Sequence, residues 1–336
     1  MASSIKSIIN AAFISILTLA FAGSTFAMNV TNTTTSFSPY VDLTLNVCGP
    51  SQSSDNDTID LVAISKESGV RNFHLAFITD AGQCVPAWGG DLSKSVSDGW
   101  ASQLTDNLRT NNIRYTVSFG GENGKDLSKS CSAEQLALIY QQIIKTYQPE
   151  GLDFDIENDT VKVPNLISAL KKIMNENSGL KISFTLPVLP EGLTTAGKNI
   201  VNQLKAANLH FVINIMVMDY SSSCTGDMGK YAIQAAKNSY AFLHTLYPSK
   251  TSAELWQMIA FTPLIGVNDT CKEKFTLANA DELRRFAQKN KLAYFSMWSM
   301  ARDNPCSGTT CCPICSGADL QTIPYEFSRH FMKQEK

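Results

Sequence analysis

The sequence lacks a strong excess of charge and a recognisable metal-binding pattern. Its 28 lysine and arginine residues nearly balance 30 aspartate and glutamate residues, which gives a formal net charge of −2. So little net charge offers no electrostatic basis for binding nucleic acid or acidic lipid. The few histidines are scattered, and no Cys or His pair stands at finger spacing from Cys312–Pro–Ile–Cys315. We therefore expect neither a zinc site nor any other metal or organic cofactor.

Long apolar runs are absent after the first 27 residues. At the N-terminus, Ile8–Ala22 is apolar and follows Lys6, and Thr25 and Ala27 occupy the −3 and −1 positions of a cleavage site. This pattern predicts a secretory signal peptide over residues 1–27. An uncleaved membrane anchor is the alternative. After cleavage we expect a secreted protein with no membrane span.

Cysteine is well represented, which fits export to an oxidising compartment. In exported proteins most cysteines pair as disulfides. Because the number here is odd, at least one thiol stays free or pairs with another chain, and the spacing does not fix the connectivity. The nine cysteines are Cys48, Cys84, Cys131, Cys224, Cys271, Cys306, Cys311, Cys312 and Cys315.

Short apolar or alternating runs recur along the chain and are separated by segments of helical character. This alternation predicts an α/β fold with a parallel sheet, and eight such units close into a (β/α)8 TIM barrel in a single domain. A doubly wound open sheet is the alternative, but no Gly-rich dinucleotide fingerprint follows the first run. The predicted strands are Val41–Leu45, Phe73–Ile78, Ile113–Phe119, Leu152–Glu157, Ile182–Leu186, Val212–Met218, Met258–Thr262 and Leu292–Met297.

The predicted helices lie between these strands and define the rest of the domain. Ser132, followed by Gln135 three residues later, predicts a capping box at the start of one helix. Residues 28–37 are rich in Thr and Asn and are expected to form a flexible leader. The Cys-rich stretch 303–317 falls in the loop between the last strand and the last helix. The predicted helices are Ala133–Tyr147, Asn165–Asn175, Lys198–Asn208, Lys230–Leu246, Asp281–Lys289 and Pro324–Lys333.

One predicted strand carries three carboxylates at alternate positions. Side chains alternate along a strand, so Asp153, Asp155 and Glu157 share one face, while their apolar neighbours face the helices. In a barrel the acidic face lines the interior and rises to the C-terminal mouth, where barrel enzymes keep their active sites. Three such carboxylates cannot all ionise cheaply, so we expect a shared proton and a glutamic acid that stays protonated near neutral pH. A structural acidic strand, held by buried cations or water, is the alternative.

The segment Glu150–Gly–Leu–Asp–Phe–Asp–Ile–Glu157 resembles the signature Asp-x-x-Asp-x-Asp-x-Glu of glycoside hydrolase family 18, with Glu150 in place of the first Asp. The resemblance covers about residues 38 to 336, which we expect to form one catalytic barrel. Four further matches follow in the family's order: Ser118–Phe–Gly120–Gly121, Met218–Asp219–Tyr220, Thr262 to Asp269, and Trp298.

The resemblance implies substrate-assisted hydrolysis of chitin or of N-acetylglucosamine oligosaccharides, with retention of configuration. In this family the acetamido oxygen of the substrate itself attacks the anomeric carbon. Glu157 would then act as acid and base, Asp155 would orient the acetamido group, and Asp153 would tune Asp155 by sharing its proton. The hydroxyl of Tyr220 would position the acetamido oxygen. Trp298 would form an apolar floor under the reacting sugar.

Five further residues are weaker candidates for substrate binding, and each has a structural alternative. Gly120 and Gly121 leave room for substrate, or serve only a tight turn. Met218 and Asp219 are substrate contacts, or Met218 is a core residue. Asn268 binds the sugar, or only caps a loop.

The glycan and the mode of action are less closely defined by the sequence. Only about 30 residues separate the last two predicted strands, so we expect no large insertion there and a shallow, open groove suited to internal cuts. An endo-β-N-acetylglucosaminidase acting on N-glycans would use the same strand, and peptidoglycan is a further possible polymer. An inactive chitin-binding lectin on the same barrel is the non-enzymatic alternative. The retention of Glu157, Asp155, Asp153 and Tyr220 argues against the lectin, and we expect a monomer.

Overall fold

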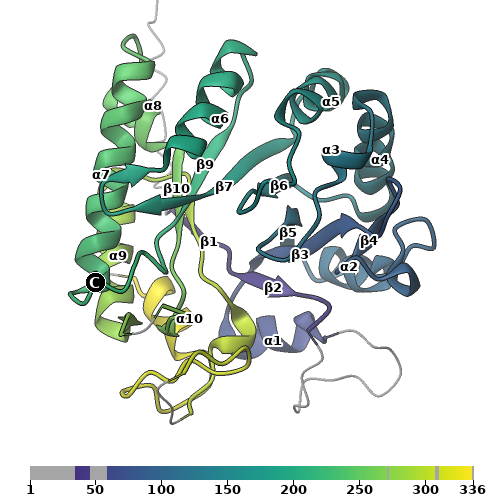
Figure 1. Ribbon diagram of the computed structural model, residues 1–336. Helices are drawn as coiled ribbons and strands as arrows, with labels where there is room; N and C mark the ends of the chain where they lie inside the picture. The colour runs from purple at the N-terminus through teal and green to yellow at the C-terminus, as the bar shows by residue number, and fades with distance from the viewer. Residues whose placement is uncertain (1–34, 46–58, 271, 307–309, 335–336) are drawn as a thin grey trace, which may run out of the picture. The chain divides into compact units, whose positions relative to one another are not determined.

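The computed structural model describes residues 35–45, 59–270, 272–306 and 310–334. The predicted signal peptide, the predicted leader up to residue 34, Cys48 and Cys271 lie outside these residues. The described part belongs to one compact unit, residues 34–336. Within it, a curved parallel sheet is surrounded by helices (Figure 1). None of the helices described is long and apolar enough to cross a membrane.

The strands close into a parallel barrel, which confirms the predicted fold class. β1 (Ser36–Phe37) pairs with β13 (Tyr294–Phe295), and β2 (Tyr40–Asp42) pairs with β3 (Asn72–Asp80). The segment from β1 to β2 therefore acts as the first strand of the barrel. It lies between β13, the last strand, and β3, the second, and so closes the ring. The other barrel strands are β5 (Arg114–Gly120), β6 (Gly151–Asp155), β7 (Lys181–Leu189), β9 (Val212–Met216) and β10 (Ile259–Thr262).

The predicted flexible leader, residues 28–37, extends too far, because its last two residues, Ser36 and Phe37, form strand β1 of the barrel. The backbone N–H of Ser38 donates to the carbonyl of Phe295 at 2.9 Å, and that of Tyr40 donates to Met297 at 3.0 Å. Pairing with the last strand thus begins at Ser36. A strand of only two residues carries no recognisable alternation, so the Thr- and Asn-rich composition hid it.

Helices cover the outer face of the barrel, and their apolar stripes form the core against the strands. In α4 the predicted capping box is present: Ser132 Oγ accepts from the backbone of Gln135 at 3.3 Å, and Gln135 Oε1 accepts from that of Ser132 at 2.8 Å. The helices are α1 (Leu61–Ser68), α2 (Ser102–Thr110), α3 (Leu127–Ser130), α4 (Ala133–Tyr147), α5 (Val163–Glu176), α6 (Thr195–Ala206), α7 (Met228–Leu246), α8 (Ser252–Trp256), α9 (Leu277–Asn290) and α10 (Glu326–Met332).

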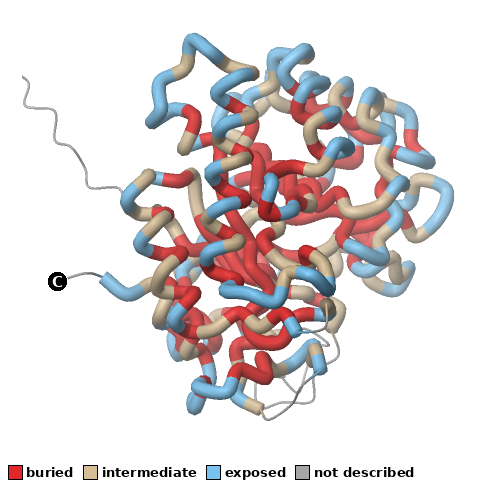
Figure 2. The backbone as a smooth tube through the Cα atoms, turned by 60° about the vertical axis from the view of Figure 1, so that its left-hand side comes forward, coloured by how far each residue is buried: buried red, intermediate tan, exposed pale blue. Residues whose placement is uncertain are grey.

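The apolar face of β6 shows how the core holds the acidic strand. The ring of Phe154 stacks on that of Phe119 at 5.2 Å and meets Tyr140 of α4 edge-on at 5.5 Å. All three side chains are buried, as are most residues of the central strands (Figure 2). With Phe154 fixed on the helix side, its neighbours in sequence, Asp153 and Asp155, must face the interior of the barrel.

Short additions decorate the ends of the barrel. β11 (Gly266–Val267) and β12 (Lys274–Phe275) form a small antiparallel hairpin between β10 and β13. This hairpin and α9 make up the connection, so the described residues contain no large insertion there. β4 (Pro86–Trp88) pairs antiparallel with the end of β3, and β8 (Gly192–Leu193) pairs antiparallel with the end of β7. The 3-10 helices are η1 (Leu92–Lys94) and η2 (Met300–Arg302).

Two disulfides are present among the described residues. Cys84–Cys131 joins the turn between β3 and β4 to the end of α3, and Cys306–Cys315 closes part of the Cys-rich stretch. Arg302 of η2, which is 1% exposed, links that stretch to the connection after β10, and it donates to Cys311 Sγ at 2.9 Å. The guanidinium of Arg302 donates to the backbone carbonyls of Ile265 at 2.9 Å and Val267 at 2.7 Å. Free thiols in the described residues belong to Cys224, Cys311 and Cys312.

Candidate active site

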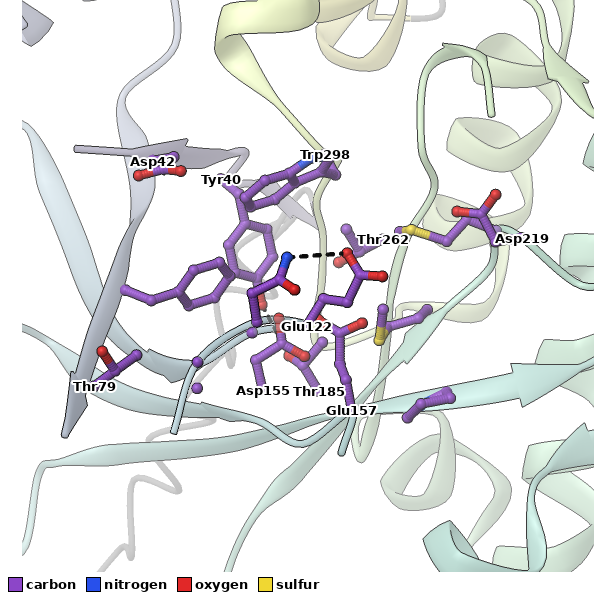
Figure 3. A pocket seen from close by; sticks show the side chains of 18 of the residues that line it. Tyr40, Asp42, Thr79, Glu122, Asp155, Glu157, Thr185, Asp219, Thr262 and Trp298 are labelled. Carbon is purple, nitrogen blue, oxygen red and sulfur yellow. Dashed lines mark hydrogen bonds between the residues drawn. The ribbon is translucent and has the colours of Figure 1, made fainter. Parts of the chain in front are cut away.

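A cleft of about 1000 Å³ opens at the C-terminal ends of the barrel strands. Asp155 and Glu157, at the end of β6, line it together with Trp298, which follows β13 (Figure 3). Residues from the ends of β2, β3, β5, β7, β9 and β10 complete its walls. The predicted acidic strand therefore rises into a cavity large enough for several sugar units.

Asp153 lies below the cleft and is fully buried. Each of its carboxylate oxygens accepts hydrogen bonds from two hydroxyl groups, which come from β2, β5 and β7. Satisfied in this way, a buried carboxylate stabilises the barrel instead of straining it. The donors to Oδ2 are Tyr40 at 2.8 Å and Ser118 at 2.6 Å, and the donors to Oδ1 are Ser183 at 2.6 Å and Thr185 at 2.9 Å.

The same polar network continues across the barrel to β9 and β10. Asn214 donates through Nδ2 to the hydroxyls of Tyr40 at 3.1 Å and Thr185 at 2.9 Å. Its Oδ1 accepts from Thr262 at 3.0 Å. The role of these residues was not predicted from the sequence. The polar pair Ser183 and Thr185, alternating with apolar residues, was the available signal, because it marks a second polar face toward the interior.

Asp155 and Glu157 have environments that favour their protonated forms. Burial raises the pKa of Asp155 well above its usual range, and the charges of Glu157 and Asp153 raise it further. Burial, followed by the charge of Glu122, raises the pKa of Glu157 to about 7, while a hydrogen bond with Asp155 opposes the rise. Glu157 can therefore hold a transferable proton near neutral pH, as the sequence predicted.

Asp155 lines the cleft and carries a carboxylate oxygen that has no partner among the described residues. It is 7% exposed, and its Oδ1 has no hydrogen-bond partner in the described part of the chain. The structure shows no hydrogen bond between Asp153 and Asp155, so these two groups interact through charge and not through the predicted shared proton. An unpaired buried oxygen on a residue that lines a cavity fits a ligand that brings its own donor.

Gly120 and Gly121 line the cleft beside the acidic strand, where a larger residue would not fit. Gly120 has a φ of 93°, and a Cβ on it would lie 2.1 Å from the carbonyl oxygen of Asp155. A Cβ on Gly121 would lie 2.9 Å from the ring of Phe77. The glycines thus let the end of β5 run close to β6, which places their backbone at the cleft wall.

Trp298, Met218 and Asp219 also line the cleft, as predicted. The indole of Trp298 is half-buried and stacks on Phe77, with ring centroids 5.6 Å apart and an interplanar angle of 16°. Its ring lies 5.9 Å from that of Tyr40. These contacts fix the indole as an aromatic surface against which the apolar face of a sugar can pack.

The structure places Tyr220 outside the cleft lining, contrary to the prediction. Its side chain is 5% exposed and packs edge-on against Tyr231 of α7 at 6.0 Å. Its hydroxyl is buried, with no hydrogen-bond partner in the described ranges. The cause is local, since Asp219 takes a left-handed φ of 45°. That turn breaks the alternation of the strand, so Met218 and Asp219 face the cleft and Tyr220 faces the helices.

Asn268, predicted to bind substrate, fastens a loop instead. It is 2% exposed and donates through Nδ2 to the carbonyls of Leu264 at 2.9 Å and Gly266 at 3.2 Å. Its Oδ1 accepts from the backbone of Asp219 at 3.3 Å. With its amide group fully used, Asn268 supports the cleft wall, and the next two residues, Asp269 and Thr270, line it. Across the residues that the structure describes, no cluster of three or more acidic, His or Cys side chains could hold a metal ion.

Comparison with known proteins adds an independent line of evidence. No model of a protein family matches the chain. The chain is 34% identical over 316 residues to a probable bifunctional chitinase/lysozyme of Escherichia coli strain K12, and 34% identical over 294 residues to endochitinase 11 of Metarhizium anisopliae. These alignments cover 88% and 81% of this chain. The chain spans only 34% and 53% of the length of those two proteins.

Solved structures give the same picture over the whole fold. A structure of catalytic-site mutants of active domain 2 of a chitinase from Pyrococcus furiosus, complexed with chito-oligosaccharides, is 32% identical, with a TM-score of 0.79. The match covers 89% of this chain and 93% of that one. Solved proteins of glycoside hydrolase family 18 at 12% to 15% identity share the fold, with TM-scores of 0.51 to 0.54.

Proposed function

The chain belongs to glycoside hydrolase family 18, and from this membership and the geometry of the cleft we propose that it is a chitinase. It would hydrolyse the β-1,4 linkages of N-acetylglucosamine polymers by the substrate-assisted retaining route. The observation that carries the proposal is that one cleft holds both Glu157, which can keep its proton near neutral pH, and the unpaired, buried acceptor of Asp155.

The reaction follows from the placement of these two groups. Glu157 donates its proton to the glycosidic oxygen as the bond from that oxygen to C1 breaks. The acetamido oxygen of the same sugar attacks C1 and forms an oxazolinium ring. Asp155 Oδ1 accepts the acetamido N–H and so orients the acetamido oxygen toward C1, and the carboxylate that Glu157 becomes after giving up its proton offsets the positive charge that develops on the ring. Water then attacks C1 as the bond from C1 to the acetamido oxygen breaks and the ring opens, Glu157 takes the proton of the water, and the configuration at C1 is retained.

Positioning of the sugar falls to the groups that line the cleft. Trp298, held by Phe77 and Tyr40, provides the aromatic floor. Tyr220 has no part in this proposal, because its hydroxyl lies outside the cleft lining. Asp153 acts from below, since its four hydroxyl partners fix β6 and hence the height of Asp155 and Glu157.

The proposal is tested with purified wild-type protein and Glu157→Gln, assayed on N-acetylglucosamine oligomers, an N-glycoprotein and peptidoglycan. We expect oligomer cleavage by the wild type and a loss of about 1,000-fold or more in the variant, because the amide cannot donate the proton. Glu150→Gln is the matched control. Glu150 begins the same segment but forms an ion pair with Lys181 at 2.9 Å outside the cleft, so its variant should keep full activity.

The other outcomes distinguish the alternatives. Cleavage of the N-glycoprotein alone would make the protein an endo-β-N-acetylglucosaminidase, and cleavage of peptidoglycan alone would assign the bacterial wall polymer. Binding of oligomers without cleavage would point to the lectin. Equal rates for wild type and Glu157→Gln would remove Glu157 from its role.

We further propose internal cleavage, because the short hairpin and α9 leave the cleft without a large added wall at the connection between β10 and β13. A soluble chitin derivative should therefore lose viscosity well before reducing ends accumulate. Disaccharide released from one chain end from the start would contradict this mode.

We also propose export with loss of residues 1–27, which a mature N-terminus at Met28, measured by mass spectrometry of the secreted protein, would support.

A further inference from the structure

Asn158, the residue directly after Glu157, fastens a turn that forms part of the cleft wall. Its Nδ2 lies within hydrogen-bond distance of three backbone carbonyls, those of Gly121 at 3.3 Å, Glu122 at 2.9 Å and Gly124 at 3.1 Å. Three acceptors around one amide nitrogen hold the whole turn of residues 121–124. The turn is thus attached to the residue that directly follows Glu157.

Further bonds complete this attachment. The Oδ1 of Asn158 accepts from the backbone N–H of Thr160 at 3.0 Å and from its hydroxyl, which fixes the orientation of the amide. The N–H of Gly121 donates to the carbonyl of Asp155 at 3.1 Å. The turn is therefore held to the end of β6 at two places, before and after Glu157.

The turn carries Glu122, whose side chain is exposed and lines the cleft (Figure 3). After burial, the charge of Glu122 is the largest contribution that raises the pKa of Glu157. The other acidic groups facing Glu157 are Asp155 on β6 and Asp219 after β9. In the described part of the chain, Glu122 forms no ion pair that would offset its charge.

We propose that Asn158 is a positioning residue which holds Glu122 beside Glu157, and that Glu122 helps to keep the catalytic proton on the acid. The proposal rests on the function proposed above, in which Glu157 is the proton donor. A carboxylate near a second carboxyl group disfavours loss of the proton from that group. Its effect depends on distance, and the amide of Asn158 fixes the backbone of the turn from which the side chain of Glu122 extends.

The test is the pH profile of kcat/KM on an N-acetylglucosamine oligomer, measured for wild type, Glu122→Gln, Asn158→Ala and the double variant. The alkaline limb should move toward acid by about half a pH unit in Glu122→Gln, because the neighbouring charge is gone. Asn158→Ala should move it in the same direction but by less, because a loosened turn weakens both the charge of Glu122, which raises the pKa of Glu157, and the smaller effect of a hydrogen bond from the backbone of Glu122, which lowers it. The double variant should show no larger shift than Glu122→Gln alone.

Asn165→Ala is the matched control for lost amide hydrogen bonds. Asn165 also joins a helix start to a loop, by donating to the carbonyls of Ser128 at 3.3 Å and Cys131 at 2.9 Å, but it does not line the cleft. Its variant should keep the wild-type alkaline limb. If Asn158→Ala fails to fold, the profile of Glu122→Gln still decides the central claim.

An alkaline limb unchanged in Glu122→Gln would overturn the proposal, as would additive shifts in the double variant. Either result leaves the proposed function standing as long as wild type cleaves the oligomer and Glu157→Gln does not. A wild type without activity would instead reject the proposed function itself.

Discussion

Asp153 is the common acceptor for four buried hydroxyl groups. Replacement by Asn keeps the shape but turns one oxygen into an NH₂ group that faces hydroxyl donors. Replacement by Ala leaves four buried hydroxyls without their acceptor. We expect Asp153→Ala to lower the free energy of unfolding by about 3–5 kcal/mol, as for the removal of one partner from a buried polar network.

Urea unfolding measures this loss, with Asp319→Asn as the control. Asp319 is exposed and pairs with Lys274 at 3.0 Å, and the loss of such a surface pair changes stability by about 0.5 kcal/mol or less. An Asp153→Ala variant as stable as this control would mean that the network does not support the barrel.

Glu157 should make stability depend on pH in a defined direction. Its pKa in the folded protein is about 7, above that of an exposed glutamic acid, so the folded state binds the proton more tightly than the unfolded state. The stability linked to this proton is present below the unfolded pKa and is lost as pH rises through about 7. The Glu157→Gln variant has no such proton to lose, so its stability does not fall in this way. The free energy of unfolding of the variant minus that of wild type should therefore rise by about 2–3 kcal/mol from pH 5 to pH 8.

Chemical unfolding at the two pH values, with Glu150→Gln as the reference, checks this difference. The reference variant should follow the wild type, because Glu150 is exposed and lies outside the cleft. A constant difference between Glu157→Gln and wild type across this range would show that the proton is held no more tightly in the fold.

The positions of single residues could be predicted where strand alternation continues, and not where it stops. Asp153, Asp155 and Glu157 follow the period of two, so their common face was readable from the sequence. Tyr220 was wrongly placed, because Asp219 adopts a left-handed conformation that a non-glycine residue rarely takes. Nothing in the local sequence marks that turn.

At the scale of elements, the approach of β5 to β6 depends on Gly120. A Cβ there would meet the carbonyl oxygen of Asp155, a backbone atom that cannot move without the strand, and φ is positive. We expect Gly120→Ala to cost about 3 kcal/mol or more and to reduce kcat, because β6 carries the acid. Gly179→Ala is the matched control, since Gly179 is exposed and a Cβ on it would meet no other atom within 4 Å.

Thermal unfolding and oligomer cleavage measure both glycine variants. Gly179→Ala should stay within about 1 kcal/mol of wild type. If Gly120→Ala were equally well tolerated, the close approach of the two strands would not be required for the cleft.

The elements that were easiest to predict are long ones, although α1 and α2 are longer than α10 and are not among the predicted helices. The long barrel strands and α4 match the predicted segments because several turns or alternations repeat there. The two-residue strands β1, β11 and β12 contain no repeat to detect: β1 is defined by its pairing with the distant β13, and β11 and β12 by their pairing with each other in a short hairpin. β13 is equally short, but it falls within the longer apolar run Leu292–Met297 that was predicted.

At the scale of the whole molecule, the two disulfides should contribute unequally to stability. Cys84–Cys131 closes a loop with a sequence separation of 47, and Cys306–Cys315 one of 9. Loop-closure entropy then gives about 4 kcal/mol for the first and about 3 kcal/mol for the second. The variants Cys84→Ala/Cys131→Ala and Cys306→Ala/Cys315→Ala, compared by thermal unfolding under oxidising conditions, should differ in that order. The reverse order would show that native-state contacts outweigh loop length.

The short segment from Ser36 to Tyr40 carries a consequence for how the molecule is made. It pairs with Tyr294–Phe295 and Met297, so the ring is joined by two stretches at almost opposite ends of the described chain. During synthesis an unpaired sheet edge therefore persists until nearly the last strand has emerged from the ribosome. No closed ring can form while the final strand is still missing, so closure of the barrel depends on contacts between residues far apart in sequence, and such contacts form slowly.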